Sequence, residues 1–171
     1  MKITVDLSPK SIASAAKALE DYAKSLDNKT SALVDSIGVK GVEIARFNYG
    51  GSEGKTHVDT GATLNSIEYE KRNERSGAVT VGGAAVWIEF GTGVKRNGAA
   101  GSYVHEKAAE LGMSPIGCYG EGHGADPNGW YYPTPDGYKW TSGIKSNPFM
   151  YQTSQDLRRY LVAIAQEVFK K

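Results

Sequence analysis

The first third of the chain shows apolar residues at three- and four-residue steps, the spacing of an amphipathic helix. Ser8 followed by Pro9 is a typical helix start, because serine caps free amides and proline tolerates the first helical position. One apolar stripe covers residues 12–26 and a second covers residues 33–49. An Asp-Asn pair at residues 27–28 lies between them and is expected to break the helix. We therefore expect a helical hairpin or one kinked helix.

From Ile67 onwards the apolar period changes to two, with Ile67 and Tyr69 on one face. A Ser-Gly pair at residues 76–77 predicts a turn before a second strand over residues 78–81, so this region should form a hairpin. A compact apolar run over residues 84–90 then ends at a glycine. Its periodicity does not distinguish a third strand from one helical turn.

The middle of the chain is rich in loops and aromatic residues. Most of the glycines and all but one of the prolines lie between residues 77 and 148. The same region contains several aromatic residues: Tyr119, Trp130, Tyr131, Tyr132, Tyr138 and Trp140. This composition is too aromatic for a plain linker and too interrupted for a long helix. We expect an ordered, loop-rich insertion over residues 93–146.

The C-terminal residues carry the strongest helical pattern. The sequence Asn147-Pro148 starts it, and apolar residues follow on one face from Met150 to Val168. The whole pattern predicts one α+β domain over residues 1–171. It contains an N-terminal helical region, a small antiparallel sheet and a long C-terminal helix packed on that sheet.

Composition limits the possible functions. The chain has 171 residues, 40% of them hydrophobic and 23% charged, which is enough to bury a core without disulfides, and Cys118 is its single cysteine. A formal charge of +1 argues against a protein that gains affinity by neutralising many phosphates. No apolar run is long enough for a signal peptide or a membrane span, so we expect a protein made and kept in cytoplasm.

Metal and phosphate sites find little support in the residue spacing. His57, His105 and His123 are scattered, and Cys118 near His123 lacks the two further ligands that a zinc site needs. A phosphate loop requires an apolar strand before its glycines and a Lys-Ser or Lys-Thr pair after them. The glycines of residues 117–124 have neither. We expect neither a metal nor a cofactor.

One segment suggests an enzyme. Residues 58–63, Val-Asp-Thr-Gly-Ala-Thr, resemble the active-site loop of retroviral-type aspartic proteases, and a homodimer could supply two copies of Asp59 that share one proton. The residues before the loop form no apolar strand, and long terminal helices differ from the all-β pattern of those proteases. The non-catalytic alternative, which we favour, is that Asp59 caps a short helix from Thr60 to about Ser66.

Three segments in a fixed order point to a family. Residues 58–67 (VDTGATLNSI), residues 86–92 (VWIEFGT) and residues 147–150 (NPFM) precede a C-terminal helix. With the N-terminal helical region and the aromatic insertion, they resemble the tail-completion proteins of long-tailed bacteriophages, also described as minor tail or head-tail joining proteins. The resemblance extends from about Pro9 to the C-terminus. It departs at residues 62–63, Ala-Thr, where members often have a basic residue after Asp-Thr-Gly.

The resemblance singles out structural or interface residues rather than catalytic ones. Those residues are Asp59, Thr60, Gly61, Leu64, Ser66, Ile67, Trp87, Glu89, Phe90, Gly91, Thr92, Trp130, Trp140, Pro148, Phe149 and Met150. Taken by their residue types, Phe90 is expected in the core and the neighbouring glycines in a turn. Phe149 and Met150 are expected to anchor the C-terminal helix to the sheet.

The function that the resemblance implies is that of a virion component without enzymatic activity. Subunits would form a ring, of six copies, at the head-proximal end of the tail. The ring would contact the tail tube or tail terminator protein and the neck (head-closure) protein. DNA would pass through its lumen without sequence-specific binding, and assembly would take place in the host bacterial cytoplasm. A near-neutral charge suits such a conduit, and exposed Trp and Tyr suit a protein interface.

Overall fold

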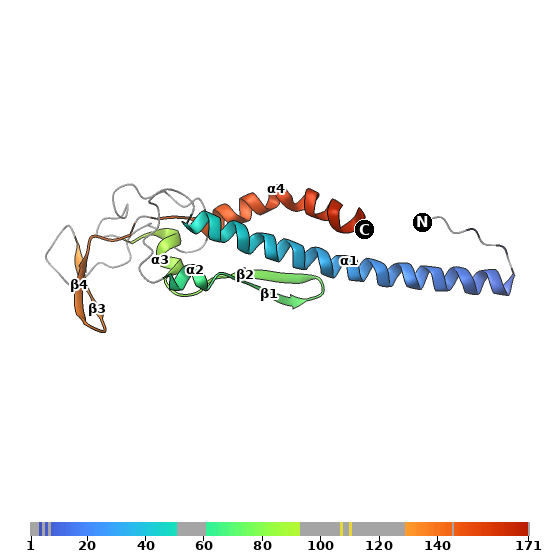
Figure 1. Ribbon diagram of the computed structural model, residues 1–171, viewed down its shortest axis with the longest axis horizontal. Helices are drawn as coiled ribbons and strands as arrows, with labels where there is room; N and C mark the ends of the chain where they lie inside the picture. The colour runs from blue at the N-terminus through green and yellow to red at the C-terminus, as the bar shows by residue number, and fades with distance from the viewer. Residues whose placement is uncertain are drawn as a thin grey trace.

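The computed structural model describes residues 4, 6, 8–50, 61–92, 107, 110, 129–144 and 146–170. Its longest element is helix α1, Pro9–Gly50 (Figure 1). Ser8 caps this helix: its Oγ accepts the N–H of Ser11 at 3.3 Å, and its carbonyl accepts the N–H of Ile12 at 3.1 Å. The predicted helix start at Ser8 and Pro9 is confirmed.

Helix α1 continues without a break through residues 27–28, so the predicted interruption there is wrong. Asp and Asn in a helix interior cost only tenths of a kcal/mol each, and residues 10–37 contain no glycine or proline. In addition, the Asp27 carboxylate pairs with Arg75 (Oδ1 to Nη2, 3.1 Å), which lies in a turn at residues 74–75. The small local penalty is therefore outweighed by tertiary contacts.

The first sheet is an antiparallel hairpin of β1 (Glu68–Asn73) and β2 (Ser76–Thr80). The predicted hairpin is confirmed, but its turn is formed by residues 74–75, just before the Ser-Gly pair that was expected to turn. Gly77 is a strand residue because the ring of Tyr69 lies over it: a Cβ at Gly77 would be 2.4 Å from the ring. This glycine provides space rather than a turn.

The hairpin packs on α1 through that same ring. A Cβ at Gly38 of α1 would lie 2.2 Å from the ring of Tyr69, so the ring is held between a glycine of the helix and a glycine of β2. The Tyr69 hydroxyl donates to Asp35 Oδ1 at 3.0 Å. Gly41 of α1 makes a similar close approach to Val79 of β2. The layer of helix and hairpin thus depends on glycines in both elements.

Helix α4, Phe149–Lys170, runs back along α1. Its first turn lies near Asn48, Tyr160 lies by Lys40, and the carbonyl of Phe169 lies by Lys29. Figure 1 shows α4 on one side of α1 and the β1–β2 hairpin on the other, so that α1 is the middle layer. The predicted α+β class is confirmed. The C-terminal helix, however, packs mainly on α1 rather than on the sheet, because α1 occupies the apolar face of the hairpin.

Two short helices lie near the C-terminal end of α1: α2, Ala62–Asn65, and α3, Ala85–Phe90. A short helix after the Asp-Thr-Gly segment was predicted, but it begins at Ala62, and its N-cap position is Gly61 rather than Asp59. Gly61 has a left-handed conformation, φ 70°, which no residue inside a right-handed helix adopts. Asp59 and Thr60 themselves lie outside the described residues. For residues 84–90, the structure decides for the helical alternative.

The second sheet is an antiparallel hairpin of β3 (Trp130–Thr134) and β4 (Gly137–Thr141), which lies within the predicted insertion. Its strands were not predicted. The backbones of Thr92 and Ile144 are joined by two hydrogen bonds of 2.9 and 3.0 Å. Thr92 and Ile144, which lie on either side of most of the predicted insertion, are therefore adjacent in the structure.

No helix in the described part of the chain combines the length and the apolar character needed to cross a membrane.

Candidate functional site

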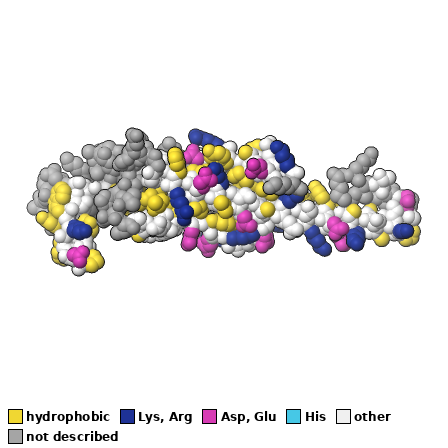
Figure 2. Space-filling model, in the orientation of Figure 1, with side chains coloured by type: hydrophobic (Ala, Val, Ile, Leu, Met, Phe, Trp, Pro, Cys, Tyr) yellow, Lys and Arg dark blue, Asp and Glu magenta, His cyan; other side chains and the backbone are white. Residues whose placement is uncertain are grey.

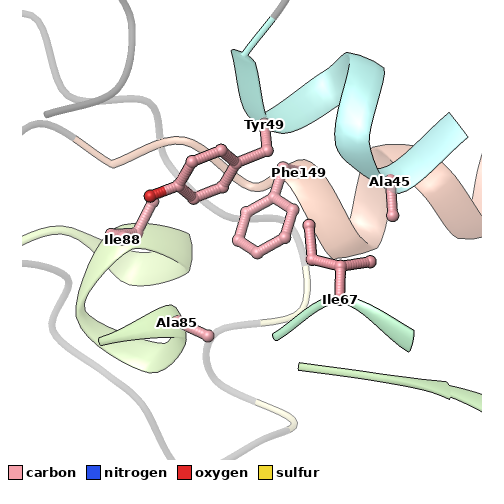
Figure 3. Packing of buried hydrophobic residues seen from close by; sticks show 6 residues of the cluster. All are labelled: Ala45, Tyr49, Ile67, Ala85, Ile88 and Phe149. Atoms are coloured by element: carbon pink, nitrogen blue, oxygen red, sulfur yellow. The ribbon is translucent and has the colours of Figure 1, made fainter. Parts of the chain in front are cut away.

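The three segments that carried the family resemblance meet at one junction near the C-terminal end of α1. Its apolar centre is Phe149, which is fully buried and meets the ring of Tyr49 edge to face at 5.1 Å. Figure 3 shows the side chain of Ile67 beside the ring of Phe149, and Ala85 and Ile88 of α3 belong to the same buried cluster. Leu64 and Met150 are partly buried against the same cluster. Residues far apart in the sequence therefore form one core.

Glu89 connects α3 to the start of α4. Its side chain is buried, and its two carboxylate oxygens accept the backbone N–H groups of Met150 and Tyr151, each at 2.9 Å. These amides belong to the first turn of a helix, where they lack partners within the helix and where the helix dipole favours a negative charge. Glu89 is thus an N-terminal cap supplied from 60 residues away in the sequence, a role that the sequence analysis did not identify.

The neighbours of Glu89 fix the chain around that cap. Phe90 is in the core, as predicted. Gly91 has φ 73°, and a Cβ there would lie 2.7 Å from the backbone nitrogen of Ser146, so this position requires glycine. Asn147 donates its N–H to the carbonyl of Ile88 at 2.7 Å and its side-chain amide to the carbonyl of Asn48 at 3.4 Å. Residues 86–92 and 147–150 therefore hold each other in place.

The remaining predicted residues of the junction have structural contacts as well. Ser66 Oγ accepts the N–H of Gly82 at 3.0 Å and donates to the carbonyl of Thr63 at 2.8 Å. Pro148 is buried directly before α4, and Phe149 packs in one cluster with Tyr49 of α1 and Ile67, against which Val79 of β2 is also packed. Trp87 differs from its neighbours, because its side chain is 44% exposed.

The β3–β4 hairpin carries an aromatic surface. Cross-strand partners lie on the same face, and Tyr131 is opposite Trp140 while Pro133 is opposite Tyr138. All four side chains are exposed, Tyr138 to 75%. We call these four residues the aromatic face. Trp130, also predicted to matter, is the first residue of β3 and is paired in register with Thr141.

Trp140 is fixed within the aromatic face by a close contact. A Cβ at Gly129 would lie 2.4 Å from its indole ring, so the ring lies against backbone and yet remains 47% exposed. Rigid aromatic side chains that stay exposed are typical of protein interfaces, since they lose little conformational entropy when a partner covers them.

The N-terminal half of α1 carries a second exposed apolar surface. Ile12, Leu19, Tyr22 and Leu26 are 37–57% exposed, although they form the predicted stripe. In Figure 1 this half of α1 extends beyond the C-terminal end of α4, at the opposite end of the molecule from β3 and β4. We call residues 9–26 the arm.

Charged residues of the described chain are mixed rather than gathered in a field of one sign, as Figure 2 shows for one face. The largest cluster joins α1 to the first hairpin. Lys71 Nζ contacts Asp35 Oδ2 at 3.0 Å and Glu74 Oε2 at 3.2 Å. Hydrogen bonds from Lys71 and Tyr69 lower the pKa of Asp35. The hydrogen bond to Asp35 raises the pKa of Lys71, and burial raises that of Tyr69.

The residues considered for catalysis or metal binding lie outside the description. Asp59, Cys118 and the histidines at positions 57, 105 and 123 are all in segments that the structure does not describe. Among the described residues, no three His, Cys, Asp or Glu side chains are grouped in a way that could hold a metal ion.

Comparison of the chain with protein-family models, with curated proteins and with solved structures finds no match.

Proposed function

We propose that this chain is a ring-forming structural protein of the tail-completion or head-tail joining type, located at the head-proximal end of a phage tail. In this role it has no enzymatic activity. It contacts the tail tube or tail terminator protein on one side and the neck protein on the other. DNA passes through the lumen without sequence-specific binding, and the protein is incorporated into the virion after assembly in the bacterial cytoplasm.

The observation that carries the proposal is the pair of exposed apolar surfaces at opposite ends of the molecule. The arm of α1 lies at one end and the aromatic face of β3–β4 at the other. Surfaces of this kind normally mark sites of protein association. Two different patches at opposite ends allow one of them to contact neighbouring copies in a ring and the other to contact a different protein.

The junction supports the same proposal in a second way. The segments that resemble the phage family contribute buried core residues, a helix cap and a glycine-dependent turn. Motifs with these roles preserve a fold rather than an active site, as expected of a structural protein. The mixed surface charge and the net charge of +1 are suitable for a conduit along which DNA must slide.

Co-sedimentation with tail tubes tests the proposal. Wild-type protein is expected to sediment with tail tubes of the phage or prophage that encodes it. Replacing Tyr131 and Tyr138 together by Ser should weaken this binding at least tenfold, because it removes exposed aromatic contact area without touching the core.

Lys139→Ser is the matched control, since Lys139 lies on the other face of the same hairpin, opposite Tyr132. Equal binding by all three proteins would show that the aromatic face is not the contact. Absence of wild-type binding would count against the proposed function itself.

A further inference from the structure

The arm of α1 presents a regular apolar stripe that the other described residues leave largely exposed. Ile12, Leu19 and Leu26 are spaced by seven residues and are 51%, 57% and 37% exposed. Tyr22, between the last two, is 47% exposed. No other labelled element lies beside this half of α1 in Figure 1. A helix with such a stripe normally buries it against a partner.

The stripe continues a helix–helix interface that already exists within the chain. Further along α1, the same seven-residue series reaches Lys40, whose Nζ lies 5.1 Å from the ring centre of Tyr160 in α4. Lys29 lies by Phe169 near the end of α4. Beyond that point an open groove lined by Lys24, Asn28 and Glu167, among others, marks where α4 stops covering α1. The arm therefore lacks the helix that α4 provides for the rest of α1.

The charges of the arm indicate what kind of helix would take that place. With Ile12, Leu19 and Leu26 as position a of a heptad, every charged residue falls at positions b, c or f: Lys10, Lys17, Glu20, Asp21, Lys24 and Asp27. Positions d, e and g hold only uncharged residues: Pro9, Ser11, Ala15, Ala16, Ala18, Tyr22, Ala23 and Ser25. Charged e and g residues ordinarily select a partner, and here they are replaced by small side chains.

An uncharged face over four of the seven positions is wider than a two-helix contact needs. This face can contact one neighbouring helix through positions e and a and a second through positions d and g. The small side chains at these positions allow the helices to approach closely. The same pattern on every copy is compatible with itself, since no charge would be desolvated by the contact. These properties favour neighbouring copies of the same helix over a partner recognised by charge.

We propose that the arm, residues 9–26, associates with the arms of neighbouring copies of this chain as a bundle of parallel helices, each contacting one arm on either side. The inference rests on the proposed ring, because cyclic symmetry gives all arms the same direction. It adds the partner of the arm, which is a second copy rather than a tail or neck protein.

Substitutions on the two faces of the arm test this inference in the full chain. Leu19→Asp places a charge in the stripe, whereas Lys17→Asp places one at position f and serves as the control. By light scattering coupled to size-exclusion chromatography, wild type and Lys17→Asp should form a species of several subunits, and Leu19→Asp should need at least tenfold higher concentration. Circular dichroism checks that both variants are folded. Assembly of Leu19→Asp at the wild-type concentration would overturn the inference.

Cross-linking distinguishes the parallel bundle from other contacts. In a Cys118→Ser background, Ala18→Cys and Ala23→Cys together place thiols at positions g and e, which face each other between adjacent parallel helices. A short bis-maleimide should then give a ladder of cross-linked species beyond the dimer. The control variant, with Lys17→Cys and Lys24→Cys at heptad position f, should give no such ladder. A product that stops at the dimer would contradict the bundle.

Rings that persist in Leu19→Asp would refute the arm contact and leave the proposed function standing. A wild type that neither assembles nor binds tail tubes would refute both the arm contact and the proposed function.

Discussion

Single residues at the junction have roles that only the folded chain defines. Glu89 is an acidic residue in an apolar segment, yet it is buried because the backbone N–H groups of Met150 and Tyr151 take the place of water. A buried carboxylate without such donors would be strongly unfavourable. The helix cap accounts for its place in the resemblance segment.

Replacing Glu89 by Gln should therefore destabilise the protein by about 1–3 kcal/mol, because the amide keeps one acceptor oxygen but turns an NH₂ group toward a backbone N–H. Urea unfolding of the purified variant measures the loss. Glu70→Gln, on the exposed strand β1, is the control and should change stability by less than about 0.5 kcal/mol. Equal stability of both variants would mean that Glu89 does not cap α4 in solution.

Gly38 gives a second prediction at this scale. In an isolated helix, Gly→Ala is stabilising by about 1 kcal/mol, but here a Cβ would lie 2.2 Å from the ring of Tyr69, which cannot retreat because Gly77 is behind it. Gly38→Ala should therefore cost about 1–3 kcal/mol. Gly50→Ala has open space around its Cβ and should be nearly neutral. A higher thermal midpoint for Gly38→Ala than for the wild type would disprove this packing.

At the scale of elements, apolar periodicity predicted most of the helices and strands whose formation depends on local sequence. The start of α1, the first hairpin and the C-terminal helix follow from caps and apolar spacing. The unbroken course of α1 could not be predicted in this way, since contacts with Arg75 and α4 outweigh the weak local preference of residues 27–28. Strands β3 and β4 were missed because proline and glycine obscure their alternation.

The candidate site was predicted as a set of residues but not as an arrangement. The segments that contain Ile67, Glu89 and Phe149 could be singled out, whereas their convergence depends on contacts across dozens of residues. Tyr69 and its two glycines were not identified as a unit, because Gly77 alone looked like a turn residue. A single sequence contains no signal for such pairings.

The contact between α1 and the first hairpin predicts a dependence on pH. The pKa of Asp35 is lowered in the folded protein by Lys71 and Tyr69, so its stabilising effect is present above the unfolded pKa of about 3.9 and is lost as pH falls through the folded pKa. Asp35→Asn should lower the thermal midpoint by at most about 2–4 °C at pH 7. The difference from wild type should shrink below about pH 4. A difference that stays constant down to pH 2 would contradict this assignment.

At the scale of the whole molecule, the chain combines one well-packed junction with exposed apolar surfaces at its two ends. The junction fixes the directions in which α1, α4 and the insertion extend. The arm and the aromatic face remain for contacts between molecules, and in our account they serve neighbouring copies and the tail, respectively. Assembly should therefore depend on residues that contribute little to the stability of the single subunit.

Negative-stain electron microscopy of the purified protein, alone and mixed with tail tubes, tests the central claim most directly. Our account predicts rings with a central opening, free in solution or seated on one end of the tubes. The variant Leu19→Asp should form no free rings under the same conditions. Isolated elongated particles in the wild-type sample, together with bare tube ends in the mixture, would contradict the account.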